Sequence, residues 1–218
     1  MTDFVLARRN MVENQLRTNK VSDPRVIDAM ATVPREAFAP SGRRSVAYID
    51  EPLPLGGGRW LPPPMIAGRM YQLAALGPGD LVLLVGAGTG YGAAILGKLA
   101  SAVVALEEDE AMAQSAEQAL GGVEADNVVV AHGALAAGWP KQAPYDAIVF
   151  EGSVEHVPDA ILQQLAPNGR LVVAIAGPTG VPVLTVMRKA GDTVAADRVC
   201  DANVPLLPGF ERAQEFVF

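Results

Sequence analysis

Apolar runs and helical stretches alternate through the second half of the chain. Segments 90–99, 109–120 and 158–166 have helical spacing. They separate short apolar runs that are typical of buried strands, at 81–85, 102–106, 127–131, 145–150 and 170–176. Continuous apolar strands alternating with helices indicate a parallel sheet that is covered on both faces. The pattern therefore predicts an α/β fold.

Helical spacing also predicts an N-terminal helical extension. Apolar positions recur at this spacing over 3–17. A second helix is expected from "SDPRVIDAM", where Ser22 or Asp23 can act as the cap and Pro24 fits the first turn. Another helix is expected directly after Pro64, ended by "GPGD".

The segment from Ser41 to Pro64 shows neither period. It contains three consecutive glycines (56–58) and three consecutive prolines (62–64), with Trp60 between them. A long irregular segment in a compact protein is usually functional or mobile. It can equally be a structural cover on the core, and the sequence leaves both readings open.

The tail adds two candidate strands, "VPVLTVMRK" and "AQEFVF", which we expect at an antiparallel edge of the sheet. We divide the chain into a helical extension with its glycine- and proline-rich arm, 1–64, and an α/β domain, 65–218, within a single structural unit. No internal repeat is visible.

Composition limits the classes of function. Half of the 218 residues are hydrophobic and 19% are charged, as in a globular protein. The net charge of −7 is a poor match for a phosphate backbone, so we expect no nucleic-acid partner. One cysteine excludes an intrachain disulfide, and with two histidines it leaves almost no possibility of a Cys/His zinc site, so we expect no metal.

Membrane and export signals are not visible. The first seventeen residues are charged every few positions and lack the apolar core of a signal peptide. No stretch approaches the roughly 20 apolar residues that span a bilayer. We expect a soluble, cytoplasmic protein without a membrane partner; the oligomeric state is not predicted.

Candidate chemistry centres on "LVLLVGAGTGYGAAILG", where an apolar strand runs into Gly86, Gly88 and Gly90. The dinucleotide fingerprint G-x-G-x-x-G/A fails from Gly86 and fits only from Gly88 to Ala93, displaced from the strand end. The P-loop pattern fails because no lysine follows. The remaining G-x-G-x-G suits S-adenosylmethionine, which has no pyrophosphate.

A ribose ligand is also favoured by the acid at the end of the next strand. Glu107 ends "AVVALEE", where a carboxylate can accept hydrogen bonds from ribose hydroxyls. Glu108 is the competing candidate for the same role.

The segment "APYDAIVFEGSVEHVPDAILQQLAPNGRLVVAIAGPTG" (143–180) resembles the protein-L-isoaspartate O-methyltransferase family. "VPREAFAP", "AYIDEPLPLG" and the glycine turn follow the family's order, so the resemblance extends from about Met11 to Gly180. It implies a doubly wound, mostly parallel seven-stranded sheet of the class I methyltransferase (Rossmann-like) type. It also implies S-adenosylmethionine as cofactor and isoaspartyl-containing proteins or peptides as substrate, methylated on the free carboxylate for repair.

The resemblance and the strand ends together give two sets of site residues. We expect cofactor-binding residues at Gly86, Ala87, Gly88, Gly90, Tyr91, Glu107, Glu108, Gly133, Ala134, Leu135 and Glu151. We expect substrate contacts from the arm at Arg59, Trp60, Leu61 and Pro63. No catalytic residue is assigned.

Several positions depart from the family's pattern. Leu84 and Ala134 stand where the family usually carries acids, and 59–61 reads Arg-Trp-Leu where it usually carries hydroxyls. Each lost acceptor weakens cofactor binding by roughly 0.5–1.5 kcal/mol if no other partner replaces it. Arg59 could pair with a carboxylate or be solvated, and Trp60 could cover the ligand or pack on the core.

New polar contacts could come from Glu151 at the end of the fourth strand, and from Glu155 and His156 after it. The departures leave a second hypothesis open, a non-catalytic protein whose site is closed by Leu84, Trp60 and nearby prolines. A methyltransferase with another acceptor is a third reading. A nicotinamide-dependent dehydrogenase comes last, supported only by the spacing from Gly88.

Overall fold

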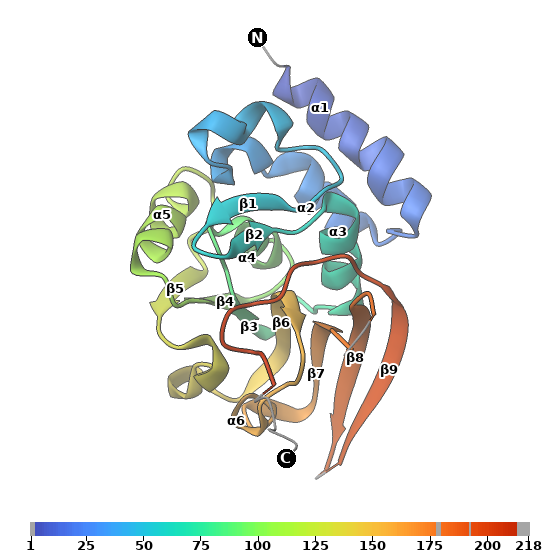
Figure 1. Ribbon diagram of the computed structural model, residues 1–218, viewed down its shortest axis with the longest axis vertical. Helices are drawn as coiled ribbons and strands as arrows, with labels where there is room; N and C mark the ends of the chain where they lie inside the picture. Colours follow the sequence, from blue (N-terminus) through green and yellow to red (C-terminus); the bar gives the residue numbers. More distant parts are fainter. Residues whose placement is uncertain (1–2, 178–179, 192, 213–218) are drawn as a thin grey trace, which may run out of the picture.

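Seven strands form one sheet in the order β5-β4-β3-β6-β7-β8-β9 (Figure 1). The computed structural model describes residues 3–177, 180–191 and 193–212. The parallel strands are β3 (Leu81–Val85), β4 (Ala102–Glu107), β5 (Val128–His132), β6 (Tyr145–Val154) and β7 (Leu165–Ile175). This order confirms the predicted α/β fold with a mostly parallel sheet.

Both faces of the sheet are buried, which explains why its strands read as continuous apolar runs. Val82 and Leu84 of β3 belong to one hydrophobic cluster, and Leu83 and Val85 belong to the other. The connecting helices are α4 (Tyr91–Gly97), α5 (Glu110–Leu120) and α6 (Asp159–Leu162). The predicted helix 158–166 is only one turn long, because the chain enters β7 at Leu165.

The N-terminal helices pack on the first of these clusters. They are α1 (Phe4–Met11), the π-helical η1 (Val12–Leu16), the 3-10 turn η2 (Arg17–Asn19), α2 (Pro24–Thr32) and α3 (Pro64–Leu73). Asp23 caps α2, since its Oδ1 accepts a hydrogen bond from the Arg25 N–H at 2.9 Å. Met11, Leu16 and Met30 are fully buried in the cluster that contains Leu84.

The segment that showed no period contains defined structure. Two 3-10 helices, η3 (Arg35–Phe38) and η4 (Ser41–Val46), precede an antiparallel hairpin of β1 (Leu53–Gly56) and β2 (Arg59–Leu61). Strands of four and three residues are too short to show an alternation. The hairpin, which we call the arm (53–61), forms a sheet of its own and lies between α5 and α3 in Figure 1.

The two tail strands have different outcomes. "VPVLTVMRK" contains β8 (Val183–Ala190), antiparallel to β7 as predicted. "AQEFVF" (213–218) lies outside the described residues. The edge strand is instead β9 (Thr193–Asp201), which the sequence analysis missed because an exposed edge strand carries no apolar run.

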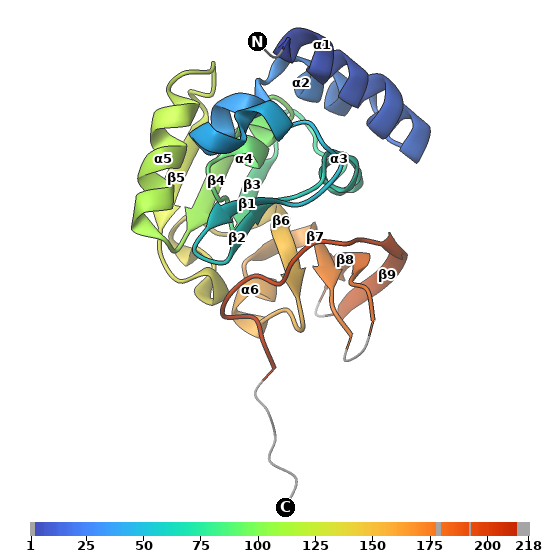
Figure 2. The same ribbon diagram turned by 45° about the horizontal axis from the view of Figure 1, so that its top comes forward.

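After β9 the chain returns across the sheet as the C-terminal segment (202–210). The Leu207 N–H donates to the Ser153 carbonyl, and the Ser153 N–H donates to the Pro205 carbonyl, each at 2.9 Å. Figure 2 shows this segment running from β9 past β7 and β6 toward α6. Two further 3-10 turns, η5 (Leu135–Ala137) and η6 (Pro140–Gln142), follow β5. Among the described residues, no helix combines the length and the apolar character that a membrane span requires.

Candidate functional site

The glycine turn joins β3 to α4 at the carboxyl end of the parallel strands. Gly86, Gly88 and Gly90 have φ values of 81°, 55° and 94°. Residues with a β-carbon rarely adopt this backbone conformation. The N–H groups of Gly86 and Ala87 both donate to the Leu106 carbonyl at 3.0 Å. These bonds hold the turn against the end of β4.

Glu107, the last residue of β4, lies buried against this turn. Its Oε2 accepts a hydrogen bond from the Gly88 N–H at 2.7 Å. Its Oε1 accepts from the N–H groups of Glu108 at 2.9 Å and Asp109 at 3.2 Å. Three backbone donors therefore stabilise the carboxylate in a position that is 0% exposed.

A fourth donor is Arg59 of the arm, whose Nη1 lies 3.0 Å from Glu107 Oε1. The Arg59 side chain is only 3% exposed. Its guanidinium lies directly on the glycine turn, since a methyl group placed on Gly86 would be 2.7 Å from Nη2. Arg59 was expected either to pair with a carboxylate or to be solvated, and Glu107 was not identified as its partner, because the two residues are 48 positions apart and no sequence spacing relates an irregular arm to a strand end.

Leu207 of the C-terminal segment also approaches the first glycine of the turn, and Leu55 of the arm approaches Gly88, where an added methyl group would lie 2.9 Å from Leu55 Cδ1. A methyl group on Gly86 would lie 3.0 Å from Leu207 Cδ2, and one on Gly152 would lie 2.5 Å from Leu207 Cγ. Leu207 was not among the predicted site residues. The available signal was Gly152, because a glycine within a strand often marks the close approach of another segment.

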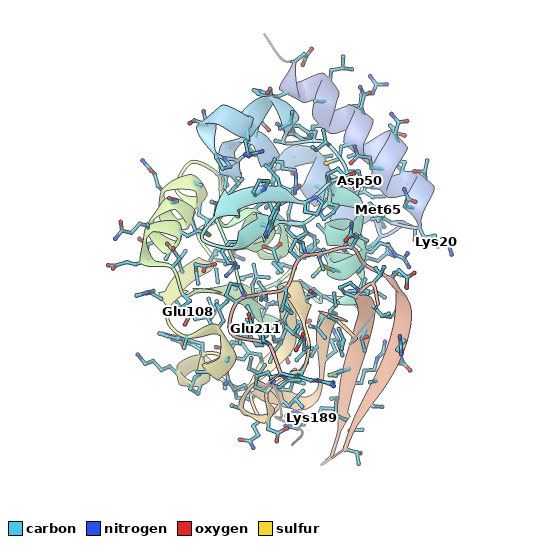
Figure 3. All side chains as sticks on the ribbon, viewed as in Figure 1. Lys20, Asp50, Met65, Glu108, Lys189 and Glu211 are labelled. Atoms are coloured by element: carbon cyan, nitrogen blue, oxygen red, sulfur yellow. The ribbon has the colours of Figure 1, made fainter. Side chains whose placement is uncertain are left out.

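A cavity of about 270 Å³ opens beside Glu107. It is lined by Gly57, Arg59, Glu107, Glu108, Asp109, Leu135 and Pro208. Glu108, labelled in Figure 3, is exposed at its edge. Gly133 is adjacent, since its N–H donates to the Glu107 carbonyl at 3.0 Å, and Ala134, which follows it, is exposed and carries no polar side chain. The structure thus gathers the predicted residues of the β4 and β5 ends around one cavity.

Other predicted residues lie away from this cavity. Tyr91 packs edge-on against Phe38, with ring centroids 5.7 Å apart. Leu61 and Pro63 are buried. Trp60 is 36% exposed and faces a second, much smaller cavity with Glu151.

The non-catalytic hypothesis expected Leu84 and Trp60, with nearby prolines, to close the site. For Leu84 and Trp60 this expectation is wrong. Leu84 is fully buried in the core and Trp60 is partly exposed, so neither fills the space over the turn. The side chains that approach the turn are those of Arg59 and Leu207 at Gly86 and that of Leu55 at Gly88.

Glu151 is a buried acid on β6. It is 3% exposed, and its Oε1 accepts a hydrogen bond from the Tyr71 hydroxyl. Burial raises the pKa of Glu151 to about 7, although the Tyr71 hydrogen bond and the charges of Arg35 and Arg59 act in the opposite direction. Of the two polar residues after it, Glu155 accepts from the Arg212 N–H at 2.5 Å and His156 is exposed.

The raised pKa of Glu151 makes stability depend on pH. The folded protein keeps a proton that the unfolded chain releases, so the free energy of unfolding falls as pH rises from about 4.5 to about 7. We expect Glu151→Gln to remove this loss, because the amide oxygen still accepts from Tyr71 but does not ionise. Urea unfolding of both proteins should show a variant that is more stable by up to roughly 3 kcal/mol at pH 8, and much less so at pH 4.5.

Glu108→Gln is the matched control, because it makes the same change at an exposed carboxylate. Its stability should follow that of the unmodified protein across the whole pH range. A Glu151→Gln curve that is parallel to both would contradict a buried, protonated Glu151.

The described part of the chain contains no group of three or more His, Cys, Asp or Glu side chains placed to hold a metal ion.

Comparison with known proteins gives a consistent result along nearly the whole chain. Residues 7–208 match the model of the protein-L-isoaspartate(D-aspartate) O-methyltransferase family. A protein-L-isoaspartate O-methyltransferase of Roseiflexus castenholzii is 40% identical over 95% of this chain and 94% of its own length. The corresponding protein 2 of an Anaeromyxobacter species is 44% identical over 84% of this chain and 75% of its own length.

Solved structures agree on the fold. One protein-L-isoaspartate O-methyltransferase superposes with a TM-score of 0.81 at 24% identity, over 93% of this chain and 66% of that chain. A beta-aspartate methyltransferase from Plasmodium falciparum, in complex with S-adenosyl-L-homocysteine, gives a TM-score of 0.76 at 21% identity. It covers 92% of this chain and 97% of that chain.

Proposed function

Because the chain belongs to the protein-L-isoaspartate(D-aspartate) O-methyltransferase family, we propose that it methylates the free carboxylate of isoaspartyl residues in damaged proteins. S-adenosylmethionine is the proposed methyl donor. The observation that carries the proposal is the strand-end acid Glu107, held against the glycine turn by the Gly88 N–H at 2.7 Å.

The residues around Glu107 fit the ribose of an adenosyl ligand. A carboxylate at the end of the second strand is the usual acceptor for ribose hydroxyls in this class of fold. Within the described residues, Glu107 Oε2 accepts a single hydrogen bond, and the adjacent cavity measures about 270 Å³. Leu84 and Ala134 offer no polar side chain, so Glu107 is the main anchor among the predicted residues.

The chemistry that S-adenosylmethionine supplies is a methyl group on a positively charged sulfur. A carboxylate acceptor is already an anion and needs no general base. The chain therefore has to position two partners and exclude water, which together account for much of such a barrier. The arm and the C-terminal segment, which cover the glycine turn, are suited to this role.

The test uses an isoaspartyl peptide and its aspartyl twin with methyl-labelled S-adenosylmethionine. We expect label in the isoaspartyl peptide only. Equal labelling of both, or none, would contradict the repair function. Calorimetric titration with S-adenosylhomocysteine separates the two parts of the proposal. If the protein binds this ligand but labels neither peptide, the proposed cofactor stands and the proposed acceptor is wrong.

Glu151 favours one second candidate, a methyltransferase whose acceptor must lose a proton. A carboxyl with a pKa of about 7 takes up a proton near neutral pH, which suits a hydroxyl or amine acceptor. The two candidates differ in the product bond. Mild alkali releases the label as methanol from a carboxyl methyl ester, but not from an ether or a methylamine.

A further inference from the structure

We propose that Arg59 is an internal gate of the cofactor site. In the closed arrangement its guanidinium pairs with Oε1 of Glu107 and lies over Gly86, and a ligand reaches the glycine turn and Glu107 together only after the arm has carried Arg59 away. This inference rests on the proposed function, because it names what controls access to the same site.

Arg59 and a ligand compete for the position over the glycine turn. Arg59 Nη1 is 3.0 Å from Glu107 Oε1, which also accepts two backbone hydrogen bonds. Arg59 Nη2 lies over Gly86, so close that an added methyl group would be 2.7 Å away. A ligand that reaches both the glycine turn and Glu107 therefore has to displace the guanidinium.

Few polar contacts attach the tip of the arm to the body of the protein. The arm is a separate two-stranded sheet, with Leu53 and Leu61 buried at its base. Its tip, Gly56–Gly58, is exposed and has positive φ at all three residues. Arg59 is the first buried side chain after this tip, so the ion pair with Glu107 is the principal polar link that holds the tip closed.

The buried guanidinium of Arg59 is incompletely satisfied in the closed arrangement. Within the described residues, its Nε and Nη2 have no hydrogen-bond partner. Buried donors without partners raise the free energy of the state that contains them. Glu107, in contrast, retains three backbone donors after Arg59 leaves. Opening therefore relieves Arg59 without leaving Glu107 unpartnered.

A gate of this kind lowers the apparent affinity for the cofactor. The measured dissociation constant equals the intrinsic one divided by the fraction of open molecules. Removing Arg59 should therefore tighten binding, which is the opposite of what a cofactor-binding residue would show.

The experiment is calorimetric titration of S-adenosylhomocysteine into the full chain and two variants. Arg59→Met keeps the unbranched stem and removes the guanidinium, and we expect its Kd to fall at least about tenfold. Arg188→Met makes the same change at the exposed ion pair with Asp197. Arg188 precedes Lys189, which Figure 3 shows far from the arm, so its Kd should not change.

A second measurement follows the arm in the protein that retains Arg59. The chain has two tryptophans, Trp60 and Trp139, so Trp139→Phe leaves Trp60 on the arm as the single reporter. We expect its emission to shift as S-adenosylhomocysteine binds. This readout tests the gate even where Arg59→Met folds poorly.

The outcomes separate the gate from the function. If Arg59→Met binds with equal or weaker affinity while the unmodified chain binds, the gate is wrong and the cofactor proposal stands. A Trp60 emission that stays constant during saturable binding also overturns the gate. If neither protein binds, both proposals fail.

Discussion

Replacing Glu107 with alanine is expected to lower the free energy of unfolding by about 3–5 kcal/mol. The carboxylate is the acceptor for the N–H groups of Gly88, Glu108 and Asp109 and for Arg59. A buried donor such as the Gly88 N–H costs about 1–3 kcal/mol when it is left without a partner. The same variant should lose binding of S-adenosylhomocysteine. Urea unfolding at pH 7 and calorimetry give the two measurements.

Two further variants show which donors carry the loss. Glu107→Gln keeps one acceptor oxygen and should lose less stability than the alanine variant. Adding Arg59→Met to Glu107→Ala should recover little, because an arm that opens already lets Arg59 reach water. Full recovery in this double variant would mean that Arg59 stays trapped over the turn, and would count against the gate.

The fold was predictable because both faces of the parallel sheet are buried. Runs such as 81–85 and 145–150 are apolar at every position or nearly so, and their order along the chain leaves few possible arrangements. The edge strand β9 (193–201) escaped because it is exposed, and the arm escaped because its strands have four and three residues. In each case the periodic signal was missing from the sequence itself.

The site was predictable only where it depends on local chain geometry. The glycine turn and Glu107 follow from the positions of two strand ends, and the structure brings them within 2.7 Å. The ion pair of Glu107 with Arg59 and the cover provided by Leu207 depend on how distant segments fold back. A glycine such as Gly152 can signal that another segment approaches, but neither residue type nor spacing says which segment it is.

Introducing an acid at Leu84 is expected to destabilise the fold severely rather than restore a contact to the cofactor. The family's pattern usually has an acid at this position, which makes Leu84→Asp the natural repair to attempt. In this chain Leu84 is fully buried, lies between Ala105 of β4 and Val149 of β6, and belongs to the hydrophobic cluster with the N-terminal helices. Leu106 and Leu135, which are close to Glu107, belong to the other cluster.

The loss in Leu84→Asp has two sources that add. Deleting the apolar side chain removes packing worth about 2–5 kcal/mol, and a buried carboxyl without a partner costs about 2 kcal/mol or more even when it is protonated. We therefore expect a decrease of at least about 4 kcal/mol in the free energy of unfolding, measured by urea denaturation. Leu84→Met, which preserves volume, should cost less than about 1.5 kcal/mol. A Leu84→Asp protein that is as stable as the original and binds S-adenosylhomocysteine more tightly would show that this side chain reaches the ligand. In that case the leucine at position 84 would simply lower the affinity for the cofactor. It would not be a residue that the surrounding core requires.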